Sequence, residues 1–212
     1  MSTRERILDA ATEVFVERGF AGARMQEIAD RAEVNKAMLH YYFTDKDHLY
    51  ETVLVSMARS LFEGVRTTFS DEALAPAERL RRAIETYFDF IAAHPEFPKL
   101  ILQDVVTGGA TTAEVFCKAQ EAANFLGAKP ALDRIERDVA AGRLRPVDSK
   151  QSIISLVGMV VFYFAAQPLM SRILDLDDRD QERFLAERKR NVIDVFLHGV
   201  LPPEASTARR NT

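Results

Sequence analysis

The spacing of apolar residues predicts helices from the start of the chain. Ile7, Ala11 and Phe15 recur at intervals of four residues, which places them on one face of a helix. Ser2 and the glutamate three residues later have the spacing of a capping box, and Gly19 supplies the left-handed residue that commonly ends a helix. The sequence therefore marks both ends of the first helix.

Two short helices and one long helix are predicted next. Apolar residues form a helical stripe over residues 25–32, and Asn35 is a good N-cap for a helix over residues 36–42. Thr44 or Asp45 can cap a fourth helix, which continues for several turns without proline or glycine. We expect this long helix to connect the N-terminal unit to the rest of the chain.

The helical pattern continues through the C-terminal part of the chain. It covers the segments 76–91, 100–106, 113–141 with a kink near Gly127 and Pro130, 150–166 and 181–201. No alternating strand pattern competes with these segments, and Gly142 with Pro146 marks a turn. The predicted fold class is therefore all-α.

Composition and charge restrict the function more than the fold. With 47% hydrophobic and 28% charged residues, the composition is that of an ordinary globular protein. The formal net charge of −4 gives no overall attraction to a polyanion, and residues 1–48 hold 7 Lys or Arg against 9 Asp or Glu. Any argument for DNA binding must therefore rest on a local motif.

Nothing in the sequence indicates export or a membrane location. A single cysteine, Cys117, cannot form an intrachain disulfide, and no basic segment followed by an apolar run resembles a signal peptide. The longest apolar stretch, residues 153–166, is shorter than the roughly 20 residues of a membrane span and is interpreted as a buried helix. We expect a cytoplasmic protein with no membrane partner.

The sequence carries no pattern of a metal site or a catalytic centre. His48, His94 and His198 form no HExxH pair, and the acidic run at residues 175–178 lacks the pattern of a calcium loop. No nucleophile elbow or phosphate-binding glycine loop occurs, and Cys117 is interpreted as a packed thiol, with a redox sensor as the alternative. We therefore expect neither an enzyme nor a cofactor.

The segment QEIADRAEVNKAMLHYYF, which begins at Gln26, has the spacing of a helix-turn-helix. Ala29 lies where two crossing helices approach closely, Val34 lies at the turn, and Leu39 packs the second helix back on the first. This arrangement leaves the N-terminal end of the second helix projecting, where it can enter a DNA major groove. The alternative is an ordinary helical hairpin.

The first 50 residues resemble the TetR family of transcriptional regulators. The sequence IADRAEVNKAMLHYYFTDKDHL follows that family's pattern through the turn, the recognition helix and the start of the next helix, and the first helix matches as well. Weaker similarity continues in AAGRLRPVD and VFLHGVLP. The resemblance implies a three-helix DNA-binding domain at residues 1–47, a helical ligand-binding and dimerisation domain at residues 48–202 and a flexible tail at residues 203–212.

The resemblance also implies DNA contacts at individual positions. They are Gln26, Lys36, Ala37, Met38, His40, Tyr42 and Lys46. We expect Tyr42, His40 and Lys46 to contact phosphates, and Gln26, Lys36 and Met38 to read bases. Glu33 stands where the family usually has glycine, and Met38 and His40 replace the common threonine and tyrosine, so the operator sequence cannot be inferred from a relative.

Ligand and dimer contacts are expected in the C-terminal domain. The predicted ligand-binding residues are Tyr87, Gln103, Phe125, Phe162 and Tyr163, although aromatic residues at helical spacing are more often plain core. By resemblance, the last two helices pair with those of a second subunit through Ile153, Leu156, Val160, Phe184, Val192, Val195 and Phe196.

The function expected from these features is that of a ligand-responsive regulator. It would bind a palindromic operator as a homodimer, act as a repressor and be released by a small apolar or aromatic effector. Two alternatives stay open: a helical binding or scaffold protein whose N-terminal module has lost DNA affinity, and activation in place of repression. The identity of the effector and the target genes do not follow from the sequence.

Overall fold

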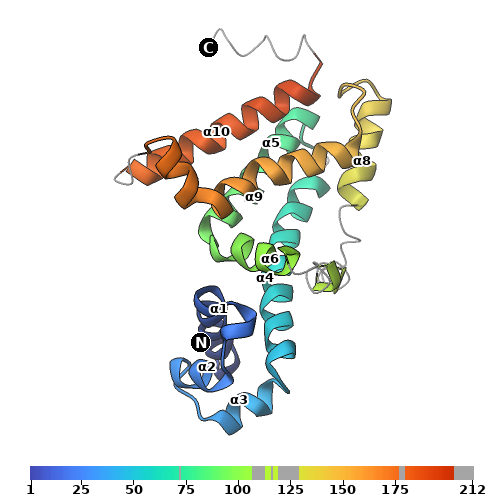
Figure 1. Ribbon diagram of the computed structural model, residues 1–212. Coiled ribbons are helices and arrows are strands. Elements are labelled where there is room, and N and C mark those ends of the chain that lie inside the picture. Colours follow the sequence, from blue (N-terminus) through green and yellow to red (C-terminus); the bar gives the residue numbers. More distant parts are fainter. Residues whose placement is uncertain (72, 107–112, 116, 119–128, 177–179, 203–212) are drawn as a thin grey trace. The chain divides into compact units, whose positions relative to one another are not determined.

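The computed structural model describes residues 1–71, 73–106, 113–115, 117–118, 129–176 and 180–202, and every regular element among them is a helix (Figure 1). The chain divides into two compact units. Unit 1 holds residues 1–60 and 96–123, and unit 2 holds residues 61–95 and 124–212. The expected domain boundary after residue 47 stays a prediction; unit 1 also takes in the first part of a long helix and residues 96–123.

Unit 1 contains α1 (Thr3–Gly22), α2 (Met25–Arg31), α3 (Lys36–Tyr42), the first part of α4 (Lys46–Ser70) and α6 (Glu96–Val106). Helix α1 packs against α2 and α6, and α2 packs against α3. The core is apolar and includes the stripe residues that the sequence pattern predicts: Ile7, Ala11, Val14, Phe15, Ile28, Ala29, Leu39, Leu49 and Val53.

The predicted helix caps of unit 1 are confirmed with one difference. Ser2 and Glu5 form the expected capping box, and the Asn35 side chain accepts a hydrogen bond of 2.7 Å from the Met38 backbone. Of the two candidates for the cap of α4, Asp45 accepts a hydrogen bond from the His48 backbone. Gly19 does have a positive φ of 67°, but it kinks α1, which continues to Gly22 and does not end there.

Unit 2 contains the remainder of α4, α5 (Pro76–Ala93), α8 (Lys129–Ala140), α9 (Ser149–Ile173) and α10 (Gln181–Val200). Helix α5 packs against both α9 and α10, α9 also packs against α10, and α8 packs against α9. Part of the predicted helix at residues 113–141, including its kink at Gly127, lies outside the described residues, as does the predicted tail at residues 203–212.

A charged cluster is buried inside unit 2. Arg79 at the start of α5 is 1% exposed and donates to the Asp138 carboxylate of α8 at 2.5 Å and to the Leu74 carbonyl at 3.1 Å. Arg143, just after α8, donates to the other carboxylate oxygen of Asp138 from Nε at 2.9 Å and from Nη2 at 2.7 Å. The cluster ties α5 to α8 and to the turn that follows α8.

Helix α9 differs from its sequence prediction in length and in burial. It runs on through Pro168 to Ile173, although a helix that ends at residue 166 was expected. The expected burial of residues 153–166 is wrong for the single chain, since only 17% of the most apolar window of α9 is buried. In the described part of the chain, α9 is also the one helix long and apolar enough to cross a membrane, with a mean hydropathy of 1.9. Core helices of soluble proteins meet the same criterion of length and composition.

Candidate nucleic-acid interface

The turn between α2 and α3 is built by backbone hydrogen bonds. The Val34 amide donates to the Ala29 carbonyl at 3.0 Å and the Glu33 amide donates to the Asp30 carbonyl at 3.2 Å, which is the Schellman pattern at a helix C-terminus. Glu33 has a φ of 54°, so a non-glycine residue occupies the left-handed position of this motif. The turn therefore keeps its geometry despite the glutamate.

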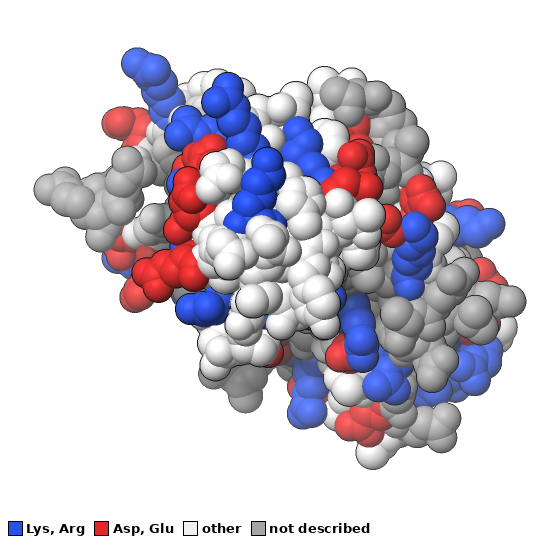
Figure 2. Space-filling model, turned by 90° about the horizontal axis from the view of Figure 1, so that it is seen from below, with Lys and Arg blue, Asp and Glu red and all other residues white. Residues whose placement is uncertain are grey.

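Helix α3 is fixed by its cap and by one buried side chain. Leu39 is fully buried, whereas Lys36, Ala37 and Met38 at the start of the helix are exposed. Viewed from below, the molecule shows an uncharged area with Lys and Arg side chains beside it and Asp and Glu side chains at its edges (Figure 2). The start of α3 is thus available to contact another molecule.

Three glutamates of unit 1 pair with arginines of the same unit. The Arg31 guanidinium contacts Glu17 at 2.8 and 2.9 Å and Glu13 at 3.4 Å. The Arg31 hydrogen bonds lower the pKa of Glu17, and the same hydrogen bonds raise the pKa of Arg31. Arg18 pairs with Glu27 at 3.3 Å. These pairs leave the balance of 7 Lys or Arg against 9 Asp or Glu in residues 1–48 unchanged, whereas α3 itself contains Lys36 and no carboxylate.

Lys46 has a structural role that the sequence did not reveal. Its ammonium donates to the carbonyls of Phe20 at 2.9 Å, Ala23 at 3.2 Å and Ala21 at 3.5 Å, and it lies 4.6 Å from the centroid of the Phe20 ring. Carbonyls at a helix C-terminus lack partners within the helix, so this ammonium satisfies the end of α1. A phosphate would have to share the Lys46 ammonium with these carbonyls.

The other predicted DNA contacts on α2 and α3 are exposed, except Tyr42. Gln26 donates its amide to Asp30 at 2.7 Å, and His40 lies 3.3 Å from the Thr44 carbonyl through Nδ1. Tyr42 is half-buried, and its ring meets that of Tyr41 edge-on at 5.2 Å. Tyr41 is 81% exposed and was left out of the predicted contacts, although its spacing of four residues from Ala37 would have indicated the same face.

The predicted ligand-binding residues belong to different units. Gln103 lies on α6 of unit 1, whereas Tyr87, Phe162 and Tyr163 lie in unit 2. Burial raises the pKa of the Tyr87 hydroxyl, Tyr163 is 7% exposed and Phe162 is 61% exposed. Phe125 lies outside the described residues. A single pocket formed by this set therefore stays a prediction.

The predicted dimer contacts are also divided. Val160, Val192 and Phe196 are buried in the core of unit 2, whereas Ile153, Leu156 and Phe184 are half-buried and Val195 is 52% exposed. The most exposed apolar residues of α9 lie roughly on the opposite side of the helix from the predicted ones: Ile154, Phe162, Leu169 and Ile173, each at least 55% exposed. Among the described residues, no group of three or more His, Cys, Asp or Glu could hold a metal ion.

The comparisons with known proteins agree with this geometry. Residues 7–53 match the family model described as "Bacterial regulatory proteins, tetR family", and residues 76–196 match "Tetracyclin repressor-like, C-terminal domain". The HTH-type transcriptional repressor NicS of Pseudomonas putida is 27% identical over 93% of this chain and 92% of its own length.

Two further proteins are similar over part of the chain. The HTH-type transcriptional activator FasR of Mycolicibacterium smegmatis is 42% identical over 53% of this chain, a match that spans about half of that protein's length (51%). The crystal structure of AibR in complex with isovaleryl coenzyme A and operator DNA has a TM-score of 0.61 and 25% identity, and covers 77% of this chain and 86% of its own. The two matching family models together with the helix-turn-helix of α2 and α3 establish that the chain belongs to the TetR family of DNA-binding transcriptional regulators and is not an enzyme.

Proposed function

We propose that this regulator represses transcription as a homodimer that binds a palindromic operator and responds to a small-molecule effector. The observation that carries the proposal is the capped helix α3, which exposes Lys36, Ala37 and Met38 at its start while Leu39 anchors it to the core. A short, anchored helix with an exposed N-terminal end is suited to insertion in a major groove.

The proposed DNA contacts divide into two kinds. Lys36 and Met38, at the exposed start of α3, would read bases together with Gln26 and Ala37. His40, Tyr41 and Tyr42 follow within one turn and would contact phosphates, which sets the register of the protein on DNA. Lys46 contributes chiefly by fixing the end of α1 to the start of α4.

The proposed dimer is supported by the surface of α9. Ile154, Phe162, Leu169 and Ile173 are each at least 55% exposed on this helix, and exposed apolar surface of this kind is typical of protein–protein contacts. Gly158 lies on the same side of α9 as Ile154 and Phe162, and an added Cβ there would meet nothing within 4 Å. A glycine in a helix interior is unfavourable unless close approach requires it, which supports a partner helix crossing at Gly158.

The relatives support a repressor with an effector without fixing the effector. NicS, which is similar over nearly the whole chain, is named a repressor, whereas FasR, similar over half of it, is named an activator. AibR was solved with isovaleryl coenzyme A and operator DNA. We infer an apolar or aromatic effector bound among the helices of the C-terminal domain, which would favour a conformer of lower operator affinity. Because the operator is its partner, we place the protein in the cytoplasm.

The DNA-binding proposal is tested by selecting bound fragments from genomic DNA at two salt concentrations. We expect one palindromic sequence and weaker binding at higher salt. Lys36→Ala should weaken operator binding. It should also either relax the preference for one base or reduce by about 1 the slope of the logarithm of the binding constant against the logarithm of the salt concentration. Lys150→Ala, the same charge change on α9, should have neither effect. A folded dimer that enriches no sequence would overturn the proposal and favour the scaffold alternative.

The dimer proposal is tested by Gly158→Leu. Since Gly158 is exposed and an added Cβ meets nothing within 4 Å in the single chain, the protomer should keep its fold while the dimer weakens, as measured by analytical ultracentrifugation and circular dichroism. Ala140→Leu, an exposed position of α8, is the matched control and should leave the dimer intact. A wild-type protein that is monomeric at micromolar concentration would contradict the proposal.

A further inference from the structure

The short turn between α3 and α4 is held by two histidines. Asp45 accepts a hydrogen bond of 2.8 Å from the His48 amide, and the His48 ring nitrogen Nδ1 accepts one of 3.4 Å from the Thr44 amide. On the other side of the turn, Nδ1 of His40 lies 3.3 Å from the Thr44 carbonyl. Thr44 therefore contacts one imidazole through its amide and the other through its carbonyl.

The partner of each ring determines where the ring carries its hydrogen. A carbonyl can only accept, so the bond between His40 and Thr44 requires a hydrogen on Nδ1 of His40. A backbone amide can only donate, so His48 must keep Nδ1 free and carry its hydrogen on Nε2. In their neutral forms the two histidines are therefore opposite tautomers.

Protonation has opposite consequences at the two rings. A proton added to His40 enters at Nε2 and leaves the bond to the Thr44 carbonyl intact. A proton added to His48 enters at Nδ1 and removes the acceptor of the Thr44 amide. It also places a positive charge in the first turn of α4, where the helix dipole disfavours it. His40 can thus change its charge without disturbing the turn, whereas His48 cannot.

The charged groups near His40 do not neutralise an imidazolium. Lys36 lies one turn earlier on α3, and its like charge disfavours a second cation. On α2, which packs against α3, Asp30 accepts from the Gln26 amide and Glu27 pairs with arginines. Among the described residues, no carboxylate forms an ion pair with His40. The charged form of His40 therefore gains most when an anion from another molecule approaches.

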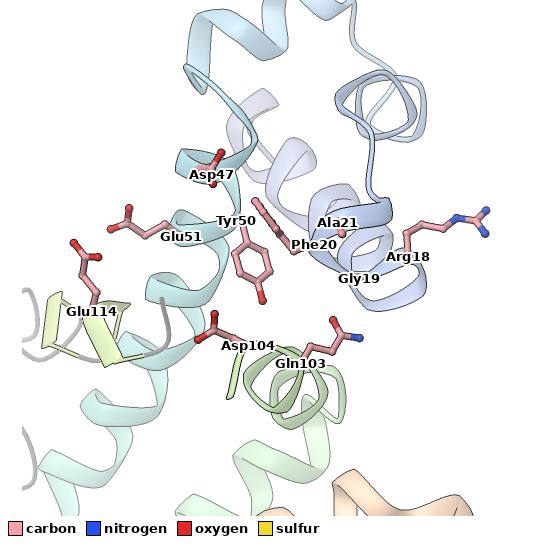
Figure 3. Close-up of a pocket in the computed structure, with 10 residues that line it drawn as sticks. All are labelled: Arg18, Gly19, Phe20, Ala21, Asp47, Tyr50, Glu51, Gln103, Asp104 and Glu114. Carbon is pink, nitrogen blue, oxygen red and sulfur yellow. The ribbon is translucent and has the colours of Figure 1, made fainter. Parts of the chain in front are cut away.

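The charged groups near His48 are engaged elsewhere. Asp45 accepts from the His48 amide, and Asp47 lines a cavity of about 460 Å³ within unit 1 (Figure 3). The His48 ring lies 5.8 Å from the Phe43 ring between centroids, and the Arg4 guanidinium lies 5.6 Å from the centroid of the same Phe43 ring. Since one cation is already held there, a second positive charge on His48 is disfavoured.

We propose that operator binding takes up one proton at His40, so that the regulator binds DNA more tightly as the pH falls from 8 to 6. In the free protein, neutral His40 holds its Nδ1 hydrogen against Thr44 and presents Nε2 as an acceptor, which repels a phosphate oxygen. The imidazolium, formed with a proton from solvent, donates to that oxygen from Nε2. This inference rests on the proposed operator binding, and it makes the phosphate contact of His40 conditional on pH.

The tautomers are tested first, without DNA, on the full-length protein labelled with ¹⁵N in its histidines. Long-range proton–nitrogen NMR spectra at pH 8 distinguish a ring nitrogen that carries a hydrogen from one that does not. We expect the Nδ1–H tautomer for His40 and the Nε2–H tautomer for His48, with His40→Tyr and His48→Gln to assign the signals. Finding His40 as the Nε2–H tautomer would overturn the proposal, because the neutral ring could then donate to a phosphate.

Proton uptake is tested with the operator selected from genomic DNA, at constant ionic strength. Between pH 8 and pH 6, the affinity of the wild type should rise about three- to tenfold more than that of His40→Tyr, whose phenol donates throughout this range. In the wild type alone, the slope of the logarithm of the binding constant against the logarithm of the salt concentration should be steeper by about 1 at pH 6.

Two other histidine variants serve as controls for this response. His48→Gln places a capping-box residue at the same position of α4, so it keeps an acceptor for the Thr44 amide but does not titrate. His198→Gln removes an exposed histidine of α10. Both variants should keep the full rise in affinity between pH 8 and pH 6.

The outcomes separate this proposal from the operator binding on which it rests. A selected operator that wild type and His40→Tyr bind with the same pH dependence overturns proton uptake and leaves the proposed function standing. A response that His48→Gln abolishes and His40→Tyr keeps also overturns it, because the proton would then enter at the other ring. A folded protein that enriches no sequence overturns both the proton uptake and the proposed function.

Discussion

The helices α2 and α8 end in the same backbone motif, but the two ends are stabilised by different means. After α2, Glu33 occupies the left-handed position with φ 54°, and after α8, Gly142 occupies it with φ 68°. The hydrogen bonds correspond: Val34 to Ala29 in one motif, and the Arg143 amide to the Asp138 carbonyl at 2.9 Å in the other.

The arginines beside the two ends also differ. Arg31 at the end of α2 pairs with glutamates that are about half exposed or more, Glu13 and Glu17. Arg143 pairs with Asp138, whose side chain is 4% exposed and which also holds the buried Arg79. The end of α2 therefore tolerates a strained residue beside screened charges, while the end of α8 is part of the core of unit 2. This difference predicts that substitutions at the end of α8 change the free energy of unfolding more than substitutions at the end of α2.

The largest effect is expected for Asp138→Asn. The substitution keeps the shape of the side chain but leaves the Arg79 guanidinium buried without its counter-charge, a loss of about 3–5 kcal/mol in the free energy of unfolding. Denaturation by urea, followed by circular dichroism, measures it. Asp133→Asn, an exposed position on the same helix, is the control. Equal stability of the two variants would mean that the cluster does not hold α5 to α8.

The two units also differ in how much could be predicted from the sequence. The capping box of Ser2 and the N-cap of Asn35 lie within three residues of their partners, so local spacing predicts them. Arg79 and Asp138 are 59 residues apart, and only the packing of α5 near α8 brings them together. Lys46 lies more than 20 residues from the carbonyls it contacts, so local spacing could not reveal this role, and the family resemblance implied phosphate binding alone.

The exposed face of α9 could not be predicted for a related reason. Its residues are apolar on all sides, so periodicity does not indicate which side faces the core of its own chain. The contacts with α5 and α10 decide this, and they bury Val160 while Phe162 stays exposed. The exposed side of α3 was more predictable, because a cap and a single anchor, Leu39, determine it.

The second prediction is Gly142→Ala. A Cβ at this position would meet nothing within 4 Å, so the substitution tests the left-handed backbone alone. We expect a loss of about 1–2 kcal/mol in the free energy of unfolding, measured as for Asp138→Asn. The matched control is Ala141→Gly, at the neighbouring exposed position just after α8. An unchanged free energy of unfolding for Gly142→Ala would show that the backbone motif at the end of α8 can rearrange at little cost in free energy.

The third prediction is the reverse change, Glu33→Gly. Glycine relieves the left-handed strain but increases the freedom of the unfolded chain, so the net gain in stability is about 0.5–1 kcal/mol. Glu33→Gln, which removes only the charge, is the control and should have no such effect. If Glu33→Gln stabilises the protein equally, the charge of Glu33 and not its backbone conformation is unfavourable.

The smallest effect is expected for Glu17→Gln, and it depends on pH. The hydrogen bonds from Arg31 lower the pKa of Glu17 below its ordinary value of 4.5. A carboxyl group whose pKa is lower in the folded state adds stability above the pKa of the unfolded state, and this contribution is lost as the pH falls through the folded pKa. Because both side chains reach solvent and the pair is screened, the effect at neutral pH should be smaller than that of any substitution above. Comparing the stability of wild type and Glu17→Gln from pH 7 to pH 3 tests the sign: the two curves should converge toward acid. Curves that diverge toward acid would mean that the interaction with Arg31 does not favour the charged form of Glu17, and the proposed contrast between the screened end of α2 and the buried end of α8 would lose its electrostatic part.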